Sequence, residues 1–225
     1  LSILLMPHKL YKILLILGIA AVVVAIFAFW FAYNSPKYLE VDFLNVGQGD
    51  AELIQTPFGQ NILIDGGPGD KVLKGLGWAL PWWDRKIDLM ILTHPHDDHV
   101  SGLIDVLKRY KVEKILYTGV AHDSPNYIAW LEAVRAKKIN LTIIDRPQVI
   151  ELGKDCKLEI IYTNKNLSGL AVENLNNSSI VAKLIYEENK FLFMGDAEEK
   201  VERELLELKA DFKADVLKVG HHGST

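Results

Sequence analysis

The segment from His94 to His99 contains three histidines and two aspartates. Imidazole and carboxylate groups are the usual protein ligands of zinc and related cations. In an extended chain alternate side chains point the same way, so His94 and His96 can face one cation. Asp98 and His99 come after a bend and can turn toward a neighbouring position. The spacing therefore predicts ligands for two adjacent divalent metal ions, which together can activate a water and neutralise a leaving oxygen.

Further candidate ligands lie where other predicted strands end. Asp196 follows a buried strand, and His221 and His222 follow the last predicted strand. Gly195 allows the backbone to come close to its neighbours before Asp196. Asp65 also ends a strand and suits a role in holding the histidine segment in place, with a simple Asp-Gly turn as the alternative. A sandwich of two sheets can bring these strand ends to one rim, so we expect a single site.

The elements that must position these residues are short strands punctuated by Gly and Pro, together with a few amphipathic helices. Strands are predicted at 38–46, 51–56, 61–65, 87–93, 114–117, 141–145, 149–152, 158–162, 179–186, 191–194 and 215–219, and helices at 102–110, 126–138 and 198–208. Blocks of strands with helices outside them predict two packed sheets covered by helices, a layered α/β arrangement.

The amino-terminal part of the chain predicts a membrane anchor. Residues 13–32 are all apolar, and as a helix they would be about 30 Å long, the thickness of the hydrocarbon core of a bilayer. A cleavable signal peptide is the alternative, but its apolar region is usually only about 7–15 residues long. Lys9 and Lys12 precede the span, which predicts a cytoplasmic amino terminus. We therefore expect a single-pass anchor at 1–36 in the cell membrane, with an extracytoplasmic domain at 37–225.

The balance of basic and acidic residues argues against general electrostatic binding of duplex DNA. The chain has 25 basic and 29 acidic residues, and removing Lys9 and Lys12 leaves 23 basic residues after the span. Nonspecific DNA binding depends on a basic surface, which this balance does not provide. A local groove for single-stranded DNA remains open as an interpretation, as does a solvated helix end. The candidate residues are Lys108, Arg109, Lys111 and Lys114.

A single cysteine excludes an intrachain disulfide. Cys156 is the only one in the chain, and it is expected to be a small core residue.

From Tyr38 to Thr225 the chain resembles the metallo-β-lactamase fold superfamily, through the His-x-His-x-Asp-His motif at 94–99 together with Asp65, Asp196 and His221. Three segments, at 45–51, 176–181 and 217–224, resemble the extracytoplasmic domain of ComEC-type competence proteins, which take up DNA. The resemblance implies an αββα sandwich that binds zinc or manganese.

The resemblance also implies roles for individual residues. One metal would take His94 and His96, and the other would take Asp98, His99 and His221, with Asp196 bridging the two. His222 would be a second ligand or a general acid. Supporting contacts to the ligands or the substrate are expected from Asp50, Asp65, Asn176 and Ser179.

One feature departs from the general superfamily pattern. Lactamases, glyoxalases and many related hydrolases carry one more histidine between the motif and the bridging aspartate, and here His122 comes too early to match it. An Asn/Ser segment at 176–179 stands there, as in the ComEC-type subgroup. Losing one imidazole would weaken the preference for zinc and make manganese an alternative.

These observations predict a metal-dependent phosphodiesterase or nuclease that attacks DNA with a metal-bound hydroxide, with Asp98 orienting the water and uptake-channel components as partners. The alternatives are a hydrolase of small esters, thioesters or β-lactams, and a non-catalytic domain of an uptake assembly. The chain stops three residues after His222 and begins with Leu, so we expect a fragment whose carboxyl-terminal part is truncated.

Overall fold

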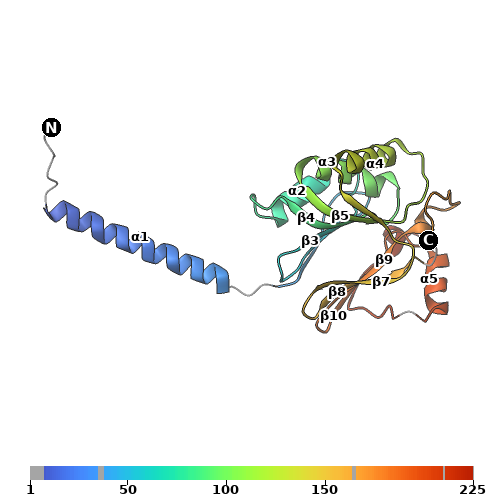
Figure 1. Ribbon diagram of the computed structural model, residues 1–225. Coiled ribbons are helices and arrows are strands. Elements are labelled where there is room, and N and C mark those ends of the chain that lie inside the picture. The colour runs from blue at the N-terminus through green and yellow to red at the C-terminus, as the bar shows by residue number, and fades with distance from the viewer. Residues whose placement is uncertain (1–7, 35–37, 164–165, 210, 225) are drawn as a thin grey trace. The chain divides into compact units, whose positions relative to one another are not determined.

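The computed structural model describes residues 8–34, 38–163, 166–209 and 211–224 (Figure 1). The chain divides into two compact units, Leu1–Lys37 and Tyr38–Thr225. The first contains α1 (His8–Asn34), in which Lys9–Trp30 is long and apolar enough to cross a membrane. This window has no polar face, which is typical of a membrane span and also of a signal sequence. The predicted boundary at residues 36 and 37 lies outside the described residues.

The second unit begins with a six-stranded sheet in the order β1-β2-β3-β4-β5-β6. Strands β1 to β3 pair antiparallel, whereas β3 to β6 pair parallel. The parallel strands are joined by helical crossovers that cover one face of the sheet (Figure 1). The strands are β1 (Glu40–Phe43), β2 (Glu52–Gln55), β3 (Asn61–Ile64), β4 (Lys86–Ile91), β5 (Lys111–Tyr117) and β6 (Asn140–Ile143), and the helices are α2 (Lys71–Ala79), α3 (Asp97–Arg109) and α4 (Pro125–Lys137).

A second sheet of five strands has the order β11-β10-β9-β8-β7 and is antiparallel except for the pair β10 and β11. Helix α5 (Glu199–Glu207) connects those two parallel strands and packs on the outer face of the sheet. The strands are β7 (Gln148–Gly153), β8 (Cys156–Tyr162), β9 (Val181–Tyr186), β10 (Asn189–Phe193) and β11 (Val216–Lys218). Two short 3-10 turns, η1 (Asn176–Ser178) and η2 (Gly220–Gly223), complete the elements.

Side chains that alternate between the two faces of a strand pack into different layers of the domain. In β3, Ile62 and Ile64 pack between the two sheets, whereas Leu63 packs against the helices. The inter-sheet core also includes Cys156, which is buried as predicted. Because successive side chains point to opposite faces of a strand, one apolar run serves both the inter-sheet core and the helix layer. The predicted two-sheet arrangement covered by helices is confirmed.

The structure corrects two expectations about helices. The helix predicted at 102–110 begins at Asp97, so Asp98 and His99 lie in its first turn and not in a loop. Two carboxylates in a first turn, Asp97 and Asp98, stabilise a helix start. Helix α2 was not predicted, because Gly75 and Gly77 interrupt its apolar pattern. All eleven predicted strands are present, with bounds that differ from the predicted ones by at most three residues.

Helix α3 lies directly on the loop after β3, and a glycine makes this possible. The Gly102 amide donates to the Gly67 carbonyl at 2.9 Å, and the Gly66 amide donates to the His99 carbonyl at 2.8 Å. A Cβ added to Gly102 would lie 1.9 Å from the Gly66 carbonyl oxygen. The absent side chain therefore sets the position of the helix that carries the histidine segment.

We predict that Gly102→Ala lowers the free energy of unfolding by about 2 kcal/mol, the usual cost of overpacking. This holds although alanine is the better helix former by about 1 kcal/mol. Gly77→Ala in α2 is the matched control, because nothing lies within 4 Å of its added Cβ, and it should be neutral or stabilising. Denaturant titration of the purified chain measures both variants. Equal stability of Gly102→Ala and the unmodified chain would contradict the close contact.

Candidate metal centre

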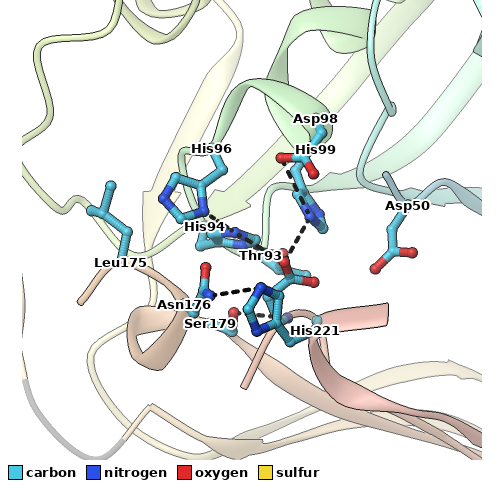
Figure 2. Close-up of polar contacts among 12 residues, drawn as sticks. Asp50, Thr93, His94, His96, Asp98, His99, Leu175, Asn176, Ser179 and His221 are labelled. Atoms are coloured by element: carbon cyan, nitrogen blue, oxygen red, sulfur yellow. Dashed lines mark hydrogen bonds and ion pairs between the residues drawn. The ribbon is translucent and has the colours of Figure 1, made fainter. Parts of the chain in front are cut away.

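The candidate site lies where strands of both sheets end. From the first sheet come the loop after β3 and the segment that joins β4 to α3, and from the second come the turns after β10 and β11 (Figure 2). Asp50 joins them from the loop between β1 and β2. The predicted convergence at one rim is therefore present in the structure.

Asp65 connects three parts of the site. Its carboxylate accepts the Thr93 amide at 2.8 Å and the Thr93 hydroxyl at 2.6 Å, and it pairs with His99 Nδ1 at 2.8 Å. Asp65 and His99 are both fully buried. These contacts fix the His99 ring so that its Nε2 atom faces Asp196 Oδ2 at 3.3 Å.

Two groups of donor atoms meet at Asp196. His94, His96 and Asp196 form one group, and Asp50, His99, Asp196 and His222 form the other, each with its ligand atoms within 4.8 Å of one another. The Asp196 Oδ2 atom lies 3.8 Å from His94 Nε2 and 3.6 Å from His222 Nε2. A carboxylate shared by two groups is the arrangement expected of a residue that bridges two cations.

Asp98 stands at the open side of the second group. Its side chain is one-third exposed, with its oxygens 3.9 Å from His99 Nε2 and 3.5 Å from His222 Nε2. It therefore faces two of the candidate ligands and solvent at once.

The two histidines of η2 point to different places. His222 contacts Asp50 Oδ1 at 3.3 Å in the second group. His221 instead faces Glu198 Oε1 at 3.3 Å and Asn176 Nδ2 at 3.3 Å. Both have left-handed backbone angles, with φ of 44° and 52°, and their ring centroids are 6.2 Å apart. His222 therefore belongs to a candidate ligand group, whereas His221, the ligand expected from sequence, belongs to neither group.

The Asn/Ser segment supports the site from the second sheet. Ser179 is fully buried, and its hydroxyl accepts the Asp196 amide at 3.1 Å. Asn176 donates to Glu198 Oε1 at 2.7 Å. These contacts hold the backbone of Asp196 and the side chain of Glu198, which faces His221, in place.

Electrostatics at the centre favour a cation. Burial lowers the pKa of His94 well below its usual range, which leaves a neutral imidazole suited to binding metal. Burial also opposes charge on His99, but Asp65 and Asp196 raise its pKa to about 11. Burial would raise the pKa of Asp196, yet His99, His94 and His222 hold it well below its usual value. Asp196 is therefore an anion aimed at the imidazoles.

Unpartnered buried atoms fit a metal ion at this place. Asp196 Oδ1 is buried and makes no hydrogen bond, and His99 Nε2 is buried with only the ion pair to Asp196 Oδ2 at 3.3 Å, an arrangement that is costly unless another group satisfies these atoms. Nitrogen and carboxylate oxygen donors together suit zinc, and the oxygen-rich second group also suits manganese. The residues present fit divalent cations.

Several residues at the site were not identified from sequence. Lys218 pairs with Asp50 and donates to the Gly195 carbonyl at 3.3 Å. The Glu198 carboxylate accepts hydrogen bonds from the side-chain amides of Asn174, Asn176 and Asn177. His122, set aside as too early in the chain, lies with its ring centroid 6.4 Å from that of His96. Only the strand-end position of Lys218 gave a signal in the sequence.

The basic residues proposed as a DNA groove lie elsewhere. Lys108 pairs with Asp105 at 2.9 Å and Lys111 pairs with Glu113 at 2.8 Å. They stand where α3 ends and β5 begins, at the opposite end of the sheet from the histidine segment. The solvated helix end is the better interpretation. A cleft of about 800 Å³ instead opens beside His96, with Asn174, Asn177 and Lys200 in its walls.

Comparison with curated proteins identifies relatives that are much longer than this chain. It is 28% identical over 204 residues to ComE operon protein 3 of Bacillus subtilis, which covers 82% of the chain and 25% of the relative. Recombination protein 2 of Haemophilus influenzae is 29% identical over 202 residues, which covers 86% of this chain and 22% of that protein. Ribonuclease Z of Clostridium botulinum is 32% identical over 88 residues, which covers 37% of this chain and 23% of that protein. The chain spans about a quarter of the length of these relatives.

Among solved structures, a metallo-β-lactamase of Cronobacter sakazakii with a HARLDQ motif superposes with a TM-score of 0.52 at 16% identity, over 81% of this chain and 75% of that one. This likeness concerns the fold. The family profile described as "Metallo-beta-lactamase superfamily" matches residues 44–225, which include every candidate ligand described above. The chain therefore belongs to the metallo-β-lactamase superfamily and is related to ComEC-type competence proteins.

Proposed function

We propose that this chain is a membrane-anchored, metal-dependent hydrolase of phosphodiesters that acts on DNA in a competence-type uptake system. The observation that carries the proposal is the Asp196 carboxylate shared by two groups of nitrogen and oxygen donors. Buried ligand groups with shifted pKa values that lie beside a cleft are better suited to chemistry than to structural support.

The proposal assigns a role to each residue of the centre. His94 and His96 hold one cation, His99, His222 and Asp50 hold the other, and Asp196 contacts both. When bound, the two ions supply a water of lowered pKa and positive charge for the oxygens of the reacting group. Asp98 is placed to accept a hydrogen bond from that water, since it faces His99 and His222 from the solvent side.

Phosphodiesters are proposed over β-lactams and thioesters for two reasons. The relatives that match most of the chain are ComE operon protein 3 and Recombination protein 2, and a partial match is Ribonuclease Z. In addition, the cleft beside His96 offers amide groups and the Lys200 cation to a backbone phosphate. The acidic balance of the domain favours single strands that enter this cleft over a duplex held across the surface.

The proposed membrane arrangement rests on α1. Lys9 and Lys12 precede the apolar window, and basic residues stay on the cytoplasmic side. The domain would then be extracytoplasmic, where incoming DNA and channel components of an uptake system would meet it.

Asp196→Ala should remove bound metal and DNA cleavage together, with activity reduced by about 100-fold or more, since losing only a supporting contact to a ligand already costs about 10–100-fold. The reason is that this one carboxylate serves both groups. Plasma mass spectrometry of metal content and cleavage of labelled single-stranded DNA measure the two effects. Asp123→Ala is the control, because Asp123 is fully exposed. Full metal content and activity in Asp196→Ala would exclude a shared-carboxylate centre.

Cleavage of DNA should need a divalent metal and should exceed β-lactam turnover by a wide margin. Chelation with EDTA should abolish cleavage, and zinc or manganese should restore it, because nitrogen and carboxylate donors can bind either ion. Parallel assays on single-stranded DNA, duplex DNA, nitrocefin and a thioester measure the preference. Efficient lactam or thioester hydrolysis without nuclease activity would favour a small-molecule hydrolase.

Alkaline phosphatase fused after Thr225 should be active in a bacterial host, because the positive-inside rule places the domain outside the cytoplasm. Replacing both Lys9 and Lys12 with glutamate should reduce this activity, whereas the same change at Lys137 and Lys138 should not. An inactive fusion with the unmodified lysines would show the opposite orientation.

A further inference from the structure

Three tryptophans form an exposed cluster at one end of the first sheet. Trp78, near the end of α2, is 83% exposed, and Trp82 and Trp83 in the loop before β4 are 78% and 69% exposed. By contrast, Trp130 in α4 is fully buried. Exposure of three large aromatic side chains together is costly in water and marks an interaction surface.

The loop that carries two of these rings is held in place. The Asp84 amide donates to the Pro81 carbonyl at 2.9 Å, which closes a turn. Asp84 Oδ2 accepts the Asn61 side-chain amide at 2.9 Å, which ties the loop to the start of β3. Trp82 and Trp83 contact each other edge to face, with ring centroids 5.5 Å apart. The rings are therefore presented by an ordered turn.

This end of the sheet is also where the chain enters from the apolar helix. Glu40 begins β1, and it lines the same hollow as Trp78. Six peptide steps separate Glu40 from Asn34, where α1 ends, and they can reach at most about 20 Å. If α1 crosses a bilayer, the start of β1 cannot lie farther than this from where that helix ends.

We propose that Trp78, Trp82 and Trp83, here called the tryptophan cluster, dock into the headgroup region of the same bilayer that α1 crosses. This inference rests on the membrane-anchor part of the proposed function and is independent of the hydrolase. Indole rings prefer the membrane–water interface because they join an apolar body to a polar N–H group.

Residue types support lipid over a second copy or another protein. The exposed aliphatic side chains of the second unit gather mainly around α5 and β11, including Leu206, Leu208 and Leu217, whereas the large exposed residues around the start of β1 are aromatic. Two exposed basic residues, Lys74 and Arg85, flank the rings and complement lipid phosphates. The neighbouring Lys86 is paired with Asp88 at 2.6 Å.

The docked surface and the candidate metal centre would face opposite ways. Strands β1, β3 and β4 run in the same direction. The tryptophan cluster lies at their amino ends, whereas Asp65 and His94 follow the carboxyl ends of β3 and β4. The six residues of β4 alone place about 20 Å between the two ends. A domain held by the cluster therefore turns its metal centre away from the bilayer.

Fluorescence quenching in nanodiscs tests this surface with the full chain. Trp30 lies in the span, so Trp30→Phe is made in every protein, leaving the cluster and buried Trp130. The nanodiscs contain phosphatidylglycerol and phosphatidylcholine, with a nitroxide on the headgroup of the latter as the quencher. Tryptophan emission should be at least about twofold lower in nanodiscs with the nitroxide than in nanodiscs without it. Aqueous acrylamide should quench the emission of the cluster poorly.

The control relocates an exposed tryptophan to the opposite end of the sheet. It combines Trp78→Phe, Trp82→Phe and Trp83→Phe with Leu170→Trp, because Leu170 is 54% exposed and its carbonyl accepts the Ala121 amide beyond the carboxyl end of β5. This protein should be quenched little by the nitroxide and strongly by acrylamide. Equal nitroxide quenching of both proteins would overturn the proposal.

Two further outcomes would also overturn it. Acrylamide access to the cluster in nanodiscs would show that the rings stay in water. Protection from acrylamide without nitroxide quenching would show that a second copy of the chain covers them. Gel filtration with the nanodiscs reports the anchor separately, and DNA cleavage by the relocated variant reports the hydrolase, so failure of either is distinguishable from failure of docking.

Discussion

The buried carboxylate of Asp65 is the interaction on which the rest of the site depends. It has no exposed surface and joins the end of β3 to Thr93 after β4 and to His99 in α3. Burial raises the pKa of Asp65, while His99 and Thr93 lower it. A buried carboxylate is stable only when such partners compensate for lost hydration. The fold therefore ties the site and the core together through one residue.

The same constraint explains why glycine stands where α3 meets the loop after β3. Asp65 can reach Thr93 and His99 only if the helix approaches the backbone of that loop, and Gly102 and Gly66 remove the side chains that would prevent it. The left-handed backbone of Asp65, with φ of 55°, turns its carboxylate toward the helix. This strain, together with the buried charge, is offset by the three hydrogen bonds that the carboxylate accepts.

Sequence was informative where chemistry is local and weak where it depends on backbone geometry. The histidine segment, Asp65 and Asp196 were identifiable because residue type and strand-end position coincide. The different contacts of His221 and His222 could not be predicted, because they follow from left-handed backbone angles at two adjacent residues. Nor could the pairing of Asp50 with Lys218 be expected, since those residues are far apart in the chain and meet only when both sheets are assembled.

Strand direction gives the domain two chemically different ends. Parallel strands joined by helices place every crossover loop after a strand at one end and every loop before a strand at the other. Here the loops after the strands carry the buried imidazoles and carboxylates, and the loop before β4 carries exposed tryptophans held by Asp84. The proposed ligands need rigid burial and the proposed membrane surface needs exposed indoles, and the two demands conflict at any single place. Separating the two groups of residues along the strands would let one sheet satisfy both demands.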